Sequence, residues 1–304
     1  MSTLVLGSIG IDDIETPFDK AEGILGGSAS YAAVAGSFFG PSRMVSIVGE
    51  DFSDDQRRLF TSRGIDLSGL KTAPGKTFRW GGRYAMNFDD RETLFTDLNV
   101  LAKFDPELPA SYQDSRFVLL GNTDPAVQLK VLEQLDGPEV VVVDTMNFWL
   151  ESQRDLVDEV LARANVVVVN EEEARMISGH YSILRSALEM LDMGLDAVII
   201  KQGAYGALLR TAGEWFFTSA YPLLEVRDPT GAGDSFAGAL TGYLAREGEL
   251  TDQKLRRAVV HGSVAASFSV EGFGLESLLN LTEQQMKDRY AEFLRFSRVE
   301  FDID

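Results

Sequence analysis

The sequence predicts a three-layer α/β/α protein with a doubly wound, mainly parallel sheet and a small inserted β-hairpin lid. Several short apolar runs bounded by Gly, Asp or Asn have the length and composition of strands buried on both faces. Amphipathic segments with helical spacing lie between many of these runs, which favours parallel strands joined by helical crossovers. One segment rich in aromatic residues and threonine interrupts this alternation and predicts the lid.

The predicted strands extend over the first two thirds of the chain. They are Leu4–Leu6, Met44–Val48, Phe117–Leu120, Val140–Val143, Val166–Val169, Ala197–Ile200 and Ala207–Leu209. The predicted helices are Pro125–Leu135, Glu171–Ile177 and Ile183–Leu191. In the first of these helices, apolar residues recur on one side at helical spacing. The sequence contains no internal repeat and no Pro/Gly/Ser-rich linker, so we expect residues 1–304 to form a single domain.

The lid prediction rests on the segment from Thr77 to Asn99, which turns at Asp89-Asp90. A hairpin of this size is not stable alone and must pack on another part of the protein. We expect residues of about 13–24 and 75–100 to form a lid over a site, a homodimer contact, or both. An antiparallel edge of the main sheet is the alternative.

Composition excludes several classes of function. The 304-residue chain has a net charge of −19, which disfavours nucleic acid and anionic membrane partners. It has no cysteine, so disulfides and thiol catalysis are excluded, and its two histidines are too few for a multi-histidine metal site. No basic leader precedes an apolar stretch, and the longest apolar runs have strand length, so we expect a cytoplasmic protein.

The strongest functional signal is the run from Asp228 to Leu240, in which a Gly-Ala-Gly turn leads directly into an apolar helix. The turn lets backbone N–H groups converge, and the helix N-terminus adds positive potential, so an anion can bind without a lysine. Asp234 follows this turn and is placed to act as a general base. The structural alternative is a capped helix with Asp228 and Asp234 as turn residues.

This segment resembles the C-terminal signature of the ribokinase-like, or phosphofructokinase-B-type, family of carbohydrate and nucleoside kinases. The resemblance covers nearly the whole chain and implies ATP and Mg²⁺ as cofactors, with K⁺ in several members. It implies that Asp234 is the catalytic base. The other positions that it assigns here are Gly231, Ala232 and Gly233 for the oxyanion hole, and Asp228 and Thr230 for a monovalent cation.

Two N-terminal segments resemble the family's acceptor-binding motifs. Gly26-Gly27 precedes a predicted helix, and two glycines allow a polar substrate close to the backbone. Tyr31 stands where many members have an Asn that contacts sugar hydroxyls, so the resemblance to a ribokinase pocket is incomplete there. Asp12 matches an Asp that binds sugar hydroxyls, with Asp13 as a neighbouring competitor.

Three further segments resemble the family's nucleotide-binding regions. Asn170 and Glu173 match an Asn-x-x-Glu motif, with Glu173 acting on Mg²⁺ through water; an acid-rich helix N-terminus is the alternative. Lys201 could contact a phosphate or be solvated. The remaining implied nucleotide positions are Gly203, Gly206, Val270 and Gly274.

Two other nucleotide motifs fail. Gly64–Gly69 has the glycine spacing of a P-loop, but Leu70 stands where the P-loop requires lysine. No Gly-x-Gly-x-x-Gly follows the first strand, which argues against a dinucleotide-dependent oxidoreductase.

We therefore expect an ATP-dependent kinase that transfers the γ-phosphoryl group to a hydroxyl of a sugar. A nucleoside kinase is the alternative, since Tyr31 and the aromatic residues of the lid segment could stack on a base. A non-catalytic ligand-binding protein is a third possibility. The lid aromatics in question are Phe78, Trp80, Tyr84 and Phe88.

Overall fold

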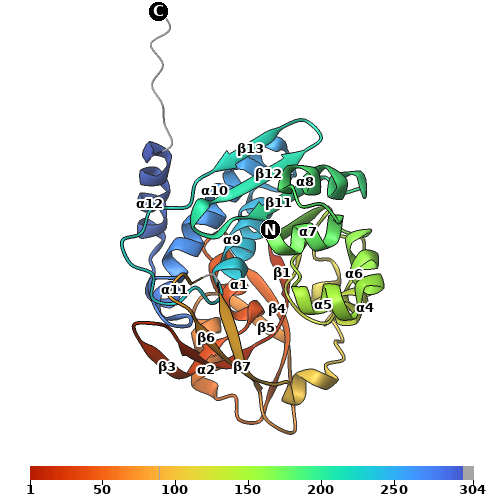
Figure 1. The fold of residues 1–304 in the computed structure, drawn as a ribbon. Helices are drawn as coiled ribbons and strands as arrows, with labels where there is room; N and C mark the ends of the chain where they lie inside the picture. The colour runs from red at the N-terminus through yellow and green to blue at the C-terminus, as the bar shows by residue number, and fades with distance from the viewer. Residues whose placement is uncertain (89, 297–304) are drawn as a thin grey trace, which may run out of the picture.

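The computed structural model describes residues 1–88 and 90–296, and it contains two separate sheets (Figure 1). The main sheet has nine strands in the order β13-β12-β11-β10-β9-β8-β1-β4-β5. All neighbours from β11 to β5 are parallel, whereas β12 and β13 are antiparallel. Their bounds are β1 Thr3–Leu6, β4 Ser42–Gly49, β5 Ile65–Ala73, β8 Phe117–Leu120, β9 Val140–Val143, β10 Val166–Asn170, β11 Ala197–Lys201, β12 Ala207–Thr211 and β13 Trp215–Thr218.

Every strand predicted from an apolar run is confirmed, and the sequence analysis missed β5 and β13 in the main sheet. Both missed strands are at the ends of the sheet. In β5 polar residues and a glycine interrupt the apolar run, and β13 is a short strand of four residues. The segment Gly64–Gly69, tested above as a P-loop, lies largely in β5.

Helices cover both faces of the main sheet, as the three-layer prediction requires (Figure 1). Successive valines of β10 belong to two different cores: Val166 and Val168 pack on one side, Val167 and Val169 on the other. The first face carries α1 Ser28–Gly36, α2 Asp54–Thr61, α9 Ala232–Glu247, α10 Asp252–Ser269, α11 Glu276–Asn280 and α12 Glu283–Phe296. The second carries α3 Ala110–Gln113, α4 Pro125–Leu132, α5 Asn147–Ser152, α6 Arg154–Leu161, α7 Glu171–Ser178 and α8 Ile183–Asp192.

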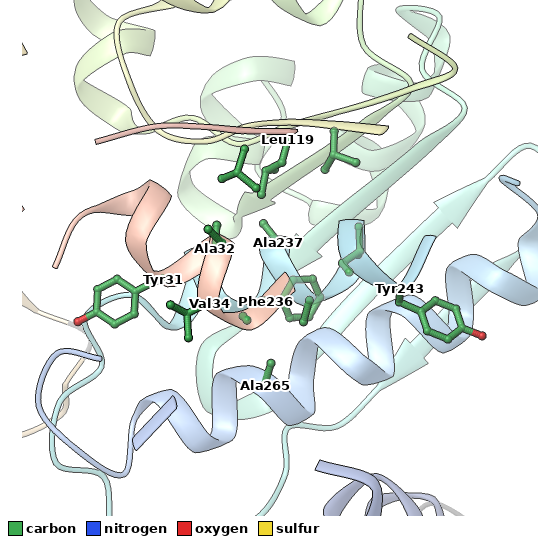
Figure 2. Close-up of a cluster of buried hydrophobic side chains, with 14 of the residues drawn as sticks. Tyr31, Ala32, Val34, Leu119, Phe236, Ala237, Tyr243 and Ala265 are labelled. Carbon is green, nitrogen blue, oxygen red and sulfur yellow. The ribbon is translucent and has the colours of Figure 1, made fainter. Parts of the chain in front are cut away.

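Helices α1 and α9 approach each other very closely, and Figure 2 shows their side chains packed together above α10. A Cβ added at Gly238 of α9 would lie 2.1 Å from the carbonyl oxygen of Ala32 in α1. Every residue of α1 is buried. This contact fixes α9, and therefore its N-terminus, against the main sheet.

The second sheet, called the lid sheet below, has the strand order β3-β2-β6-β7. Strands β6 (Phe78–Tyr84) and β7 (Arg91–Asp97) pair antiparallel and confirm the predicted hairpin, although Asp89 of the predicted turn lies outside the described residues. A second hairpin, β2 (Gly10–Glu15) with β3 (Lys20–Gly26), joins it through parallel pairing of β2 with β6. The hairpin is therefore not an edge of the main sheet.

Within the described part of the chain, no helix is both long enough and apolar enough to cross a bilayer.

Candidate active site

Polar side chains collect where the parallel strands of the main sheet end, opposite the N-terminus of α9. Asp144 directly follows β9, and the last residues of β10 and β11, Asn170 and Lys201, are register partners. The carboxyl edge of a parallel sheet is where ligands bind in folds of this class.

The Gly-Ala-Gly turn starts α9 as the sequence predicted. Gly231 is the N-cap residue with φ of 75°, and a Cβ there would lie 2.4 Å from the ring of Tyr31. Both the left-handed backbone and the close contact require glycine. The Ser235 N–H donates to the Gly231 carbonyl (2.8 Å), whereas among the described residues the Gly233 N–H has no backbone acceptor. That N–H is available to an anion.

Lys201 brings positive charge to this turn. A Cβ added at Gly233 would lie 2.9 Å from the Lys201 Nζ atom. The lysine side chain is only 18% exposed and forms an ion pair with Asp144 at 3.4 Å. It is therefore not the solvated lysine that the sequence left open, and it supplies local positive potential in an acidic protein.

Asp234 lies in the first turn of α9, directly after Gly233. The pKa of its carboxyl is raised to about 7, first by burial and then by the Asp144 carboxylate, while the Lys201 ammonium opposes the rise. A carboxylate whose pKa is close to neutral is matched to general-base catalysis at physiological pH.

Asn170 and Glu173 form a capping box at the start of α7. The Asn170 N–H donates to Glu173 Oε2 (2.8 Å), and the Glu173 N–H donates to Asn170 Oδ1 (2.9 Å). The alternative interpretation, an acidic helix N-terminus, therefore also describes these two residues. Burial raises the pKa of Glu173 to about 7; Lys201 opposes this, and Asp144 adds to it.

These groups fit a hydrated divalent cation. Asp144, Glu173 and Asp234 all have pKa values raised mainly by burial, and Lys201 is the cation that opposes the rise in each case. A divalent ion would stabilise their ionised forms. Within the described residues, no three Asp, Glu or His side chains are close enough to hold a metal ion directly. Binding through water and phosphate oxygens, the usual mode of Mg²⁺, agrees with this arrangement.

Asp12 lies in β2 of the lid sheet and faces the site, not solvent. It is 4% exposed, and its pKa is raised to about 8 by burial, then by Asp228, Asp234 and Asp13. A Cβ at Gly26 would lie 1.9 Å from Asp12 Oδ2, so the di-glycine segment is what leaves room for the carboxyl. Gly27 has φ of 94° and precedes α1.

Asp13 has a different role from Asp12. It forms an ion pair with Arg79 (3.0 Å) and accepts a hydrogen bond from the Gly23 N–H (2.7 Å) within the lid sheet. Asp13, the alternative to Asp12 as the acceptor-binding carboxylate, therefore stabilises the lid sheet.

Two buried polar atoms on this side of the site have no partner among the described residues: Asp12 Oδ1 and the hydroxyl of Tyr31. Tyr31 is 1% exposed, and burial together with Asp228, Asp12 and Asp234 raises the pKa of its hydroxyl well above the usual value. Buried polar groups in folded proteins are nearly always hydrogen-bonded. A ligand hydroxyl or a water molecule would supply the missing hydrogen bond to each of these atoms.

Asp228 and Thr230 form the loop that precedes the Gly-Ala-Gly turn. Asp228 is fully buried, its Oδ1 accepts from the Thr230 N–H (2.8 Å), and its own N–H donates to the Val270 carbonyl (3.3 Å). The Gly274 N–H lies 3.5 Å from Asp228 Oδ2. Burial raises the pKa of Asp228. The structure thus brings Asp228, Thr230, Val270 and Gly274 together at one buried carboxyl, and binding of a monovalent cation there stays a prediction.

Gly203 and Gly206 form a turn after Lys201, η2 Gly203–Tyr205, with φ of 54° and 114°. A Cβ at Gly206 would lie 1.9 Å from the Thr218 carbonyl oxygen in β13. The tight turn between β11 and β12 thus explains why glycine stands at both positions. Their contact with a nucleotide stays a prediction.

Sequence reasoning missed Asp144 and the position of Tyr84. Asp144 directly follows an apolar strand, and Asn170 and Lys201 come directly after the apolar residues of theirs. This shared position at the carboxyl end of a strand could have identified Asp144 from the sequence. The Tyr84 hydroxyl is 3.0 Å from Thr230 Oγ1 and connects the lid sheet to the glycine turn. No local pattern in the sequence could have found that contact, because it depends on how the lid sheet packs.

Comparison with known proteins agrees with this geometry. The family model for pfkB family carbohydrate kinases matches residues 18–281. The cytidine kinase of Thermococcus kodakarensis is 30% identical over 250 residues, covering 80% of this chain and 88% of the relative.

Solved structures show the same fold. The nucleoside kinase of Methanocaldococcus jannaschii superposes with a TM-score of 0.76 at 22% identity, covering 96% of this chain and 99% of the other. An E. coli chain assigned as ribokinase II, in complex with ATP and Mg²⁺, gives a TM-score of 0.79 at 21% identity with the same coverage.

Proposed function

Because the chain belongs to the pfkB family of carbohydrate kinases, we propose that it is a nucleoside kinase that uses ATP and Mg²⁺ to phosphorylate a hydroxyl of its substrate. At the coarser level, it is a phosphotransferase that acts on a sugar or a nucleoside. The observation that carries the proposed chemistry is the position of Asp234 beside the anion hole at the start of α9.

The nucleoside preference revises the order of the two substrate classes. The sequence analysis placed a sugar first, on the basis of Asp12. The 30% identity to a cytidine kinase supports the alternative instead. Tyr31 supports it as well, because a buried phenol with an unpartnered hydroxyl replaces the Asn typical of the family. The lid aromatics contribute less, since the Trp80 ring is covered by the Arg91 guanidinium at 5.1 Å.

In the proposed mechanism, each residue has a separate task. The Asp12 carboxylate and the Tyr31 hydroxyl bind and orient the acceptor by hydrogen bonds to its hydroxyl groups. Asp234 takes the proton from the attacking hydroxyl, while the Gly233 N–H and Lys201 stabilise negative charge on the transferred group. The nucleotide would supply the phosphoryl group, and a bound Mg²⁺ would neutralise part of its charge. Glu173 and Asn170 would hold the ion through water, and Asp228 and Thr230 would lie beside K⁺.

A substrate panel tests the proposed class. We expect ADP formation to be faster with cytidine, adenosine or inosine than with ribose or fructose, at equal concentrations and saturating Mg²⁺-ATP. A coupled assay for ADP measures this, with the Asp234→Asn variant as the blank. Faster turnover of ribose or fructose would return the substrate to the sugar class, and no ADP with any acceptor would leave the non-catalytic alternative.

The pKa of Asp234 predicts the pH dependence of the reaction. Asp234 must be ionised to accept a proton, so kcat/KM should rise with pH up to about 7 and level off above it. The Lys201→Met variant loses the charge that stabilises the carboxylate, so its rising limb should move to higher pH. Lys254→Met is the control, because Lys254 is paired with Glu249 away from the site. Coincident profiles for the wild type and Lys201→Met would contradict the assignment.

A further inference from the structure

Strand β6 of the lid sheet is anchored at both ends to other parts of the protein. At its start, the Thr77 N–H donates to Asp51 Oδ1 (2.8 Å), and Thr77 Oγ1 accepts from the Gly49 N–H (3.0 Å), where β4 ends. At its other end, the Tyr84 hydroxyl lies 3.0 Å from Thr230 Oγ1, one residue before the N-cap of α9. The strand therefore connects the end of β4 to the glycine turn.

The contact at the Tyr84 end of the strand is buried. Tyr84 is 8% exposed, and burial raises the pKa of its hydroxyl above the usual value, so the phenol stays protonated at neutral pH. Two neutral hydroxyl groups form one hydrogen bond, with either group as the donor. Removing the Thr230 hydroxyl would leave the buried phenol without this partner, and buried polar groups that lose a partner are costly.

Thr230 connects this contact to the shape of the glycine turn. Its N–H donates to Asp228 Oδ1 (2.8 Å), and the next residue, Gly231, has the left-handed φ of 75°. The Tyr31 ring lies so close to Gly231 that a Cβ there would be 2.4 Å from it. Tyr31 of α1 and Tyr84 of the lid sheet thus contact successive residues at the start of α9.

The same strand is paired with the segment that carries the acceptor-binding carboxyl. Trp80 of β6 is the register partner of Asp12 in β2, so both side chains project from the same face of the lid sheet. Tyr84 lies four residues further along β6 and projects from that face as well, because side chains alternate along a strand. A displacement of this sheet that moves Asp12 therefore also moves the hydroxyl that contacts Thr230.

We propose that Tyr84 is a positioning residue that holds the glycine turn in the shape needed for phosphoryl transfer, through its hydrogen bond to Thr230. The proposal rests on the kinase function proposed above, because the turn ends at Gly233, whose N–H is assigned there to the transferred group. Tyr84 acts through Thr230, and this role requires no contact with either substrate. A displacement of about 1 Å in a group of this kind can reduce a rate by about 10²-fold.

The test compares Tyr84→Phe with Asp19→Asn, because both break a contact between the lid sheet and this loop. Asp19, in the turn between β2 and β3, forms an ion pair with Arg227 at 3.2 Å, and both side chains are about half exposed. Exposed ion pairs contribute little. We expect Tyr84→Phe to lower kcat about tenfold and to leave the KM values for nucleotide and acceptor within about twofold. Asp19→Asn should change neither quantity.

A double-mutant cycle shows whether the loss comes from the bond to Thr230. Thr230→Val removes the partner hydroxyl from the other side and keeps the backbone N–H that donates to Asp228. In the Thr230→Val background, Tyr84→Phe should change kcat by less than about twofold. The cycle thereby separates this bond from the other neighbours of the phenol, such as the Arg91 guanidinium. Thr230→Ser keeps the hydroxyl and should retain most of the activity.

Amide hydrogen exchange provides a readout that does not need turnover, because it reports local opening of the turn. The peptide that covers residues 228–240 should exchange faster in Tyr84→Phe than in the wild type, whereas Asp19→Asn should match the wild type. Tyr112→Phe is the control for loss of a phenol hydroxyl. Its bond to the Asp66 carbonyl (2.9 Å) lies at β5, outside the site, so residues 228–240 should exchange as in the wild type.

The outcomes that overturn the proposal differ from a failure of the kinase assignment. Equal kcat values for Tyr84→Phe and Asp19→Asn, or a Tyr84→Phe defect confined to the KM for the acceptor, would refute the positioning role. Additive effects of Tyr84→Phe and Thr230→Val on kcat would refute it as well. A wild type that forms no ADP with any acceptor refutes the proposed function instead. The exchange measurement then decides the role of Tyr84, and unchanged exchange over residues 228–240 in Tyr84→Phe overturns it.

Discussion

The Asp234→Asn variant is expected to lose nearly all turnover while it still binds both ligands. Asparagine has the same shape but cannot take a proton from the acceptor, and general-base catalysis contributes about 10²–10⁴-fold to the rate. We therefore expect kcat to fall by that factor, with the dissociation constants of nucleotide and acceptor within about threefold of the wild type. Steady-state kinetics and calorimetry on the same preparation measure the two quantities.

The stability of Asp234→Asn should move in the opposite direction to its activity. Burial raises the folded-state pKa of Asp234 to about 7, above the ordinary 3.8. Between these values the unfolded chain releases a proton that the folded chain keeps, so the carboxyl destabilises the fold progressively as pH rises. At pH 8 the variant should thus melt at a higher temperature than the wild type. Asp13→Asn is the control and should keep kcat within a few-fold; near-normal kcat in Asp234→Asn would reject the base assignment.

The Gly238→Ala variant is expected to be strongly destabilised, although alanine is normally the better helix residue. In an open helix, Gly→Ala should stabilise by about 1 kcal/mol. Here the added methyl would lie 2.1 Å from the Ala32 carbonyl oxygen and 2.5 Å from its Cα atom, so α1 and α9 must separate. Overpacking of this kind costs about 1–3 kcal/mol or more, and it should outweigh the gain. Thermal and denaturant unfolding measure the difference.

Gly36→Ala is the matched comparison for Gly238→Ala, because it adds a methyl group to the same helix contact from the α1 side. Its Cβ would lie 3.1 Å from the Gly238 carbonyl oxygen, a distance that a shift of a few tenths of an ångström relieves. We expect a smaller loss of melting temperature than for Gly238→Ala. If Gly36→Ala is the more destabilising of the two, the close contact at Gly238 does not govern the packing of these helices.

The sequence predicted those parts of the fold that depend on local patterns. Buried parallel strands such as Val140–Val143 have no polar side, so an apolar run is sufficient to locate them. The outer strand β5 alternates polar and apolar residues with glycine, and its pattern does not distinguish it from a loop. The partners of the lid hairpin, β2 and β3, were equally hidden, because strand pairing between segments far apart in sequence leaves no local trace.

The same distinction applies to the candidate site. Asp234, Gly231 and Asp12 lie in motifs whose residues are close in sequence, and the structure brings the motifs together at one edge of the sheet. The contact of Tyr84 with Thr230 could not be identified in this way, since it arises from the packing of the lid sheet on the loop at Thr230. The exposed or buried state of Lys201 was undecidable for the same reason: it depends on Asp144, far away in the chain.

The contact between Tyr31 and Gly231 limits how this enzyme could evolve a new acceptor preference. The ring of Tyr31 packs against Gly231, the first residue of the proposed phosphate-binding turn, while its hydroxyl is buried without a partner among the described residues and is proposed to bind the acceptor. A smaller side chain at position 31, which would enlarge the acceptor pocket, would therefore also remove the packing contact with Gly231. Descendants with altered selectivity should carry a compensating bulky side chain nearby, and directed evolution of this protein should recover changes at position 31 only in pairs.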